Sequence, residues 1–281
     1  CISTAFGVMN KQYSNSHTFT ISNPVSAPNE INIIFTNYNR DEILDKAFDF
    51  HSKGNILEAI KYYKDFVSKG FTDSALFSNY ATILRKIGHI KEAEFYLRKA
   101  IQLSPEFAEA HSNLGSVLRD LCKLDEAELH TKLAINLKPS YPEALINMAS
   151  ILKDRGDSEQ ADLLLRKAIK LDPNSAIAYS NLGCLLRDQG NLLEAESCMR
   201  KAIQLDQNYV DAYANFGGIL KDLGKKEQAI KCWKKAIELD PKLDKFRFIL
   251  AQQFYYDGDY ELAINYLQDN RYGRSQSLYL S

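Results

Sequence analysis

The sequence predicts an all-α fold, a solenoid of about seven stacked helix-turn-helix units. The 281 residues carry an internal repeat of 34 residues without insertions, which is typical of such arrays. Counted within the repeat, place 20 is Ala in all seven copies and place 8 is always Ala or Gly, so two helices can pack closely. Place 15 is Gly in six copies and place 32 is Pro in four, and both residues end helices.

Residues 1–39 precede the repeats and show no helical period. They are rich in Asn, Ser and Thr and contain Pro24 and Pro28, a composition for which we expect a mostly disordered arm. Within it, the segment "EINIIF" at 30–35 is compatible with either a short strand or a docking segment.

The array occupies residues 40–270, with units that begin at residues 40, 74, 108, 142, 176, 210 and 244. In each unit we expect helix A at about places 2–14, a short turn, and helix B at about places 17–30. Helices of this length are marginal alone in water, so stacking has to bury their apolar faces. Cys122 replaces the turn Gly of the third unit, which predicts strain of about 1 kcal/mol at that turn.

Both ends of the sequence suggest a fragment. The chain begins with Cys, and residues 271–281 stop inside a new apolar run, so we expect a truncated C-terminal stub. The last unit, from residue 244, is rich in Phe and Tyr, which predicts weak self-association through it.

Composition excludes several classes of protein. The net charge is −1 and basic residues alternate with acidic ones, which argues against a nucleic-acid groove. No window holds the 18 or more apolar residues of a membrane span, and no signal peptide opens the chain. The five cysteines lack metal-ligand spacing, so we expect reduced thiols in or near the core and a cytoplasmic location.

An asparagine recurs at place 6 of helix A, although Asn costs about 0.6 kcal/mol relative to Ala inside a helix. At 100° per residue, place 6 points away from the core places 4, 8 and 11, and small residues at place 9 lie beside it. Five consecutive units carry this residue: Asn79, Asn113, Asn147, Asn181 and Asn215. The pattern predicts a row of uncovered amides along one face.

Charged residues edge this row, with bases at place 12 and aspartates at place 13. They add to the candidate site Arg119, Arg187, Asp120, Asp154, Asp188 and Asp222. On one interpretation, duplication copied a tolerated surface residue and the charges merely solvate the face. On the other, the amides bind the backbone of an extended peptide, because a primary amide both donates and accepts, and the charges add selectivity.

The period, the helix-turn-helix pattern and the residues at places 8, 15, 20 and 32 resemble the tetratricopeptide repeat (TPR) family over residues 40–270. This resemblance implies a right-handed solenoid in which helix A lines a concave groove. The Asn row is similar to the asparagine ladder of the O-linked N-acetylglucosaminyl transferases, which implies sequence-tolerant binding of extended polypeptide. The chain lacks the Lys at place 5 and the Asn at place 9 of arrays that clamp chaperone tails.

The motifs of common enzymes are absent from the sequence, among them GxxxxGK[ST], HExxH and GxSxG. We therefore predict no catalytic residue, no cofactor and no metal, and no enzyme activity of these residues. His111 and His130 stand at places that hold other residues elsewhere, so we expect them in packing or at the surface, and Trp233 in the core.

The leading prediction is thus a scaffold that binds an extended peptide or protein segment, with neither nucleic acid nor a membrane as partner. The alternative is the substrate-recognition N-terminal half of a larger enzyme, because the array also looks like those of bacterial proteins that end in a transferase or oxygenase domain. That domain would be a glycosyl-, sulfo- or methyltransferase or an iron oxygenase.

Overall fold

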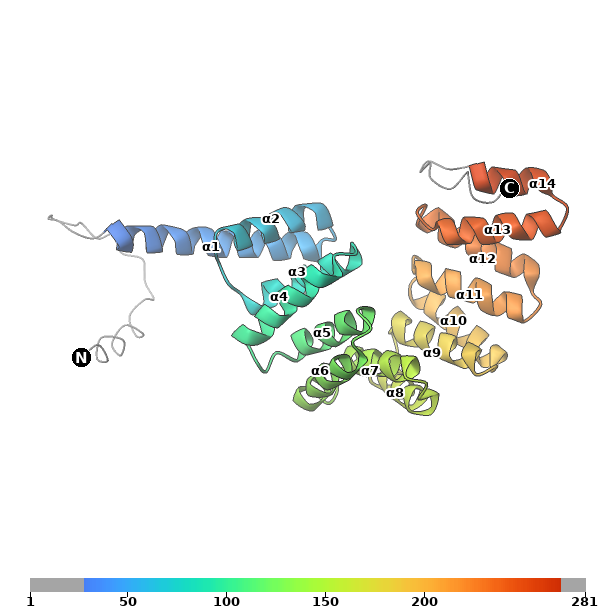
Figure 1. Ribbon diagram of the computed structural model, residues 1–281, viewed down its shortest axis with the longest axis horizontal. Coiled ribbons are helices and arrows are strands. Elements are labelled where there is room, and N and C mark those ends of the chain that lie inside the picture. Colours follow the sequence, from blue (N-terminus) through green and yellow to red (C-terminus); the bar gives the residue numbers. More distant parts are fainter. Residues whose placement is uncertain (1–27, 269–281) are drawn as a thin grey trace.

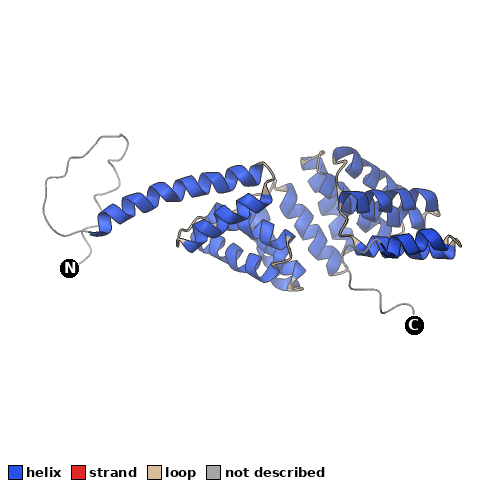
Figure 2. Cartoon of the chain, turned by 90° about the horizontal axis from the view of Figure 1, so that it is seen from above, coloured by secondary structure: helices blue, strands red, loops and turns tan. Residues whose placement is uncertain are grey.

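The computed structural model describes residues 28–268, which form fourteen α-helices and no strand (Figures 1 and 2). The A helices are α1 Pro28–Ser52, α3 Ser74–Lys86, α5 Ala108–Asp120, α7 Pro142–Asp154, α9 Ala176–Asp188, α11 Val210–Asp222 and α13 Asp244–Tyr256. The B helices are α2 Ile56–Ser68, α4 Ile90–Leu103, α6 Leu124–Leu137, α8 Ser158–Leu171, α10 Leu192–Leu205, α12 Lys226–Leu239 and α14 Tyr260–Gln268. The predicted all-α solenoid is confirmed, with most A helices one residue earlier than expected.

Local chemistry sets where the helices begin and end. Side-chain oxygens of Asp73, Asp157 and Ser175 accept bonds from backbone N–H groups of the first turns of α3, α8 and α9. The six glycines at place 15 adopt φ between +73° and +87°, the left-handed conformation that commonly terminates a helix.

Cys122 takes the same left-handed conformation without being glycine, at φ 59°. The predicted strain in the third turn is therefore real, because the Cβ of an L-residue crowds the following carbonyl there. Cys122→Gly is expected to raise the free energy of unfolding by about 1 kcal/mol in chemical denaturation. The control is Gly156→Cys at φ +87° in the next unit, which should lower it by a similar amount. A neutral effect of both changes would contradict this account.

The array curves, and over α3 to α8 its A helices lie on the inner side of the curve (Figure 1). Adjacent A helices contact one another directly: α3 with α5, α5 with α7, α7 with α9, and α9 with α11. Within the described chain, B helices of adjacent units make no comparable contacts, and each packs instead on the next A helix. Because successive A helices lie closer together than successive B helices, the face that the A helices form is the concave one.

Small residues allow the close packing within each unit. Ala at place 20 is fully buried in nearly every unit, and Gly217 at place 8 lets the indole of Trp233 lie against α11. Trp233 is buried, as predicted. The buried apolar side chains fall into two clusters, one over units one to three and one over units four to seven, with Ile151 of α7 joining the first.

The structure differs from the sequence expectations at two places. Residues 28–39 belong to helix α1, whereas we expected a mostly disordered arm with a short strand or a docking segment at 30–35. Once the first unit nucleates a helix, each added residue costs little, and Pro28 is tolerated in a first helical turn. Cys122 is exposed rather than near the core, because it stands at a turn. Cys184, Cys198 and Cys232 are free thiols at half-buried or buried positions.

The remaining expectations for the two ends, at 1–27 and 269–281, lie outside the described residues. Among residues 28–268, no helix combines the length and the apolar character that a membrane crossing needs.

Candidate functional site

The five row asparagines lie on consecutive A helices, α3 to α11, and all are half-buried. They follow the seam where neighbouring A helices meet on the concave side, rather than an open surface. The sequence placed them correctly away from the core of their own unit, but it did not predict that the adjacent unit would partly cover them.

Three of the amides bond to the preceding unit. Asn113 Nδ2 donates to Ser78 Oγ at 3.1 Å, and Asn181 Nδ2 donates to Ser150 Oγ at 3.5 Å. Asn147 Nδ2 donates to Ser112 Oγ at 2.9 Å and to its carbonyl oxygen at 3.3 Å. The row is therefore in part a set of hydrogen bonds that hold helix A to helix A.

The amides differ in what they leave for a ligand. In Asn147 both the amide nitrogen and the amide oxygen form hydrogen bonds, since its Oδ1 also accepts from Ser116 Oγ at 3.4 Å. The Oδ1 atoms of Asn113 and Asn181 have no partner among the described residues, nor do the side chains of Asn79 and Asn215. No buried side-chain nitrogen or oxygen there lacks a partner, so these atoms must reach solvent.

The charged candidates pair with one another along the array. The base at place 12 of each unit meets the aspartate at place 13 of the next, over four successive junctions. The pairs are Arg85–Asp120 at 2.6 Å, Arg119–Asp154 at 3.3 Å, Lys153–Asp188 at 2.7 Å and Arg187–Asp222 at 2.5 Å. Both members of each pair are partly exposed, so each contributes about 0–1 kcal/mol.

Arg187 illustrates how these pairs sit on the backbone. Its guanidinium lies across Gly218, where an added Cβ would stand 2.7 Å from Nη1. The hydrogen bond to Asp222 raises the pKa of Arg187, so the guanidinium stays charged at any physiological pH.

A cleft of about 200 Å³ opens between α7, α8 and α9, with one edge formed by Arg119 of α5. It brings together three predicted residues, Arg119, Asp154 and Asn181, with Ser150, Lys153 and Cys184 beside them. Ala149, Ala161, Leu165 and Leu185 also line it, so the cleft reaches the core between two units.

This arrangement can bind but offers no activated nucleophile. Burial raises the pKa of the Cys184 thiol, which keeps it protonated at neutral pH. Within the described part of the chain, no group of three His, Cys, Asp or Glu side chains that could hold a metal ion is found.

Sequence reasoning also missed a polar contact between two histidines. His111 Nδ1 lies 2.9 Å from His130 Nδ1, and the two rings come from different helices of the third unit. Ligand spacing along a single helix cannot reveal a pair that forms across α5 and α6. The signal that was available is that both histidines occupy the places of the aromatic pair Phe77 and Tyr96 in the second unit.

Models of one known protein family match several segments of the chain. Family models described as "Tetratricopeptide repeat" match residues 75–107 and 142–175, residues 164–197, and residues 210–243. The match at 210–243 coincides with the sixth unit as read from the sequence. A search of curated proteins found no significant match.

Solved structures of helical-repeat proteins are similar in fold. A thermophilic TPR protein of Thermus thermophilus has a TM-score of 0.60 at 18% identity, covering 65% of this chain and 100% of that one. A tetratricopeptide repeat protein from Parabacteroides merdae has a TM-score of 0.58 at 19% identity, with 82% and 91% covered. Pseudomonas aeruginosa PilF has a TM-score of 0.56 at 18% identity, with 69% and 88% covered.

Proposed function

The chain is a tetratricopeptide repeat protein, of the kind that serves as a scaffold for protein interaction, and we propose that it binds an extended peptide along its concave helix A face. The observation that carries the proposal is the cleft at Asn181, where an amide oxygen that accepts no bond faces solvent beside small residues. An extended peptide presents backbone N–H groups that such an oxygen accepts.

The amide row has two tasks in this proposal. Asn147 holds adjacent A helices together, whereas Asn79, Asn113, Asn181 and Asn215 keep atoms for the ligand. The residues at place 9 next to the row, Ser150 and Cys184 among them, are small enough to let a peptide backbone approach the amides.

In this proposal the charged candidate residues have a structural role, whereas the sequence predicted that they add selectivity for the peptide. Because each Arg or Lys faces an Asp of the next unit, the pairs largely cancel their own charge. We propose that they fix the spacing of the A helices and leave recognition to the peptide backbone. Binding should therefore depend weakly on salt.

Peptides selected from a random 12-residue display library on the whole chain provide the test. With a selected peptide as probe, Asn181→Ala is expected to weaken binding about fivefold in isothermal titration, the loss of one neutral hydrogen bond. Asn113→Ala should act similarly.

Lys167→Ala on the exposed face of α8 is the matched control and should leave affinity unchanged. If both asparagine variants retain full affinity for every selected peptide, the amides are structural and the groove proposal is wrong. A substrate-recognition half of a larger enzyme would use the same face, so the assay tests the groove for both readings.

A further inference from the structure

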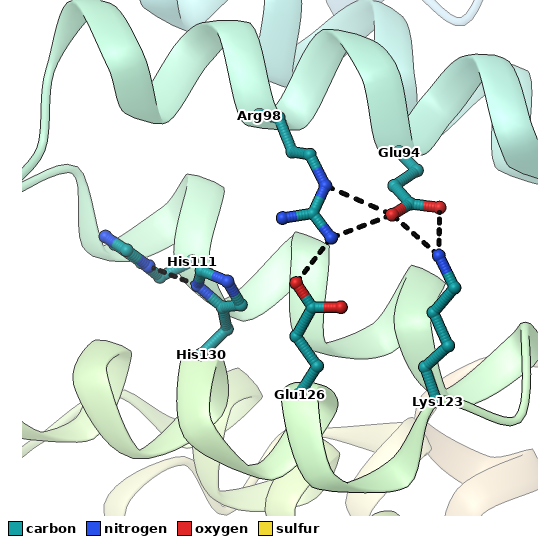
Figure 3. Close-up of polar contacts among 6 residues, drawn as sticks. All are labelled: Glu94, Arg98, His111, Lys123, Glu126 and His130. Atoms are coloured by element: carbon teal, nitrogen blue, oxygen red, sulfur yellow. Dashed lines mark hydrogen bonds and ion pairs between the residues drawn. The ribbon is translucent and has the colours of Figure 1, made fainter.

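The third unit contains a histidine pair in place of an apolar contact (Figure 3). His111 of α5 is buried and His130 of α6 is half-buried. Their rings stack with centroids 5.2 Å apart and an interplanar angle of 25°. His111 Nε2 also lies 2.9 Å from the carbonyl oxygen of Pro105, in the linker that joins the second and third units.

These contacts fix where the protons are. The Pro105 carbonyl can only accept, so His111 Nε2 carries a hydrogen and the Nδ1 of neutral His111 is an acceptor. The 2.9 Å contact then requires that His130 Nδ1 donates. His130 Nε2 has no partner among the described residues and, by the absence of buried unpaired atoms there, reaches solvent.

The closed pair has room for one added proton but not for two. The first binds His130 Nε2 and leaves both hydrogen bonds intact. A second would have to bind His111 Nδ1, which already faces the N–H of His130. Two Nδ1–H groups on two positive rings would then face each other with their nitrogens 2.9 Å apart, so the contact has to open.

The charges around the pair provide no compensation for a second proton. Arg98 of α4 contacts Glu126 at 2.5 Å and Glu94 at 2.8 Å, and Lys123 contacts Glu94 at 2.9 Å (Figure 3). These two acids and two bases neutralise one another. Burial lowers the pKa of His130, as do His111 and Arg98, and Glu126 opposes them.

The third unit buries smaller side chains on its helix B than the units on either side of it do. Helix α6 buries Ala127, Thr131 and Ala134, no side chain larger than threonine. Cys122 strains the turn between α5 and α6, and the two core clusters divide next to this unit.

We propose that His111 and His130 form an acid-sensitive joint, at which uptake of a second proton separates α5 from α6 and from the linker at Pro105. The joint lies inside the third unit, next to the boundary between the two core clusters, so its opening changes the curvature of the groove and thereby the length of peptide that can lie in it. The joint itself does not depend on the proposed peptide binding.

The direction of the pH effect follows from proton counting. The open unit binds up to two protons below the ordinary histidine pKa of about 6.5, whereas the closed unit binds at most one. The closed state is therefore most stable relative to the open state above about pH 6.5. This preference decreases as the pH falls. The equilibrium constant for opening increases about tenfold for each unit by which the pH falls, for every proton that only the open unit binds.

Hydrogen–deuterium exchange of the whole chain at about pH 7.5, 6.5 and 5.5 tests the joint, with protection corrected for the intrinsic rate at each pH. Protection over 108–137 is expected to fall about tenfold from pH 6.5 to 5.5, relative to 142–171 as internal control. This range lies above the titration of ordinary carboxylates.

The matched variant copies the neighbouring unit. His111→Phe with His130→Tyr restores the Phe77–Tyr96 type of contact and should abolish the relative loss of protection. If the Phe/Tyr variant folds poorly, His111→Leu with His130→Leu replaces it, because the fourth unit has Leu145 and Leu164 at these places. A loss of protection that persists in a folded variant overturns the proposal.

A second measurement needs no variant. Histidine ring resonances of the wild-type chain should show one imidazole of the pair that takes up no proton while the third unit stays folded. The proposal is overturned if both rings become charged near the ordinary histidine pKa of about 6.5 with the native fold intact.

Discussion

Gly217→Ala is expected to lower the free energy of unfolding by about 2 kcal/mol, although Ala is the better helix former. The new Cβ would stand 2.2 Å from Trp233 Nε1 and 2.5 Å from its Cδ1. The indole is buried, and its Nε1 donates to the carbonyl oxygen of Ala214 at 3.2 Å. Displacing it causes overpacking, costs that bond, and outweighs the gain in helix propensity of about 1 kcal/mol. Chemical denaturation monitored by tryptophan fluorescence measures the change.

The adjacent glycine is the control for this prediction. In Gly218→Ala the added Cβ meets the flexible end of Arg187, which can move aside, so stability should stay within about 0.5 kcal/mol. Adding Trp233→Leu to Gly217→Ala should recover stability, because the second and fourth units hold Ala–Leu pairs at these places. Helical circular dichroism follows this variant without the tryptophan. Equal effects of the two glycine changes would contradict the packing argument.

Asn147→Ala is expected to lower the free energy of unfolding by about 2 kcal/mol. Two buried hydroxyls, those of Ser112 and Ser116, would lose their hydrogen-bond partner. Leaving such groups unpaired costs about 1–3 kcal/mol each, against about 0.6 kcal/mol gained in helix propensity. Urea denaturation followed by circular dichroism checks the value.

Asn215→Ala is the matched control, since the Asn215 side chain has no hydrogen bond within the described residues. It should leave stability unchanged or raise it by up to about 0.6 kcal/mol. If Asn147→Ala behaves like Asn215→Ala, the bonds between A helices contribute nothing and the row has no structural role.

The sequence predicted the repeat and the interior of each unit well. Ala at place 20, Gly at place 15 and the core position of Trp233 follow from spacing along one helix or one turn, and the structure confirms them. It predicted the strained turn at Cys122 for the same reason.

The asparagines of the row lie away from the core of their own unit, as the sequence predicted. Their bonds to Ser78, Ser112 and Ser150 were missed. So were the ion pairs between neighbouring units and the contact of His111 with His130. Each joins residues on different helices, and a helical period says nothing about which side chains of two helices meet. The peptide-binding role of the row stays a prediction.

The sequence by itself determined that this chain is a stack of two-helix units, because a 34-residue period fixes which residues each unit buries and where each helix stops. Only the tertiary structure decided which polar side chains direct their hydrogen bonds and charges to the neighbouring unit and which have no partner among the described residues. The physical reason is that these bonds depend on distances of about 3 Å between separate helices, and such distances are set by how the units stack.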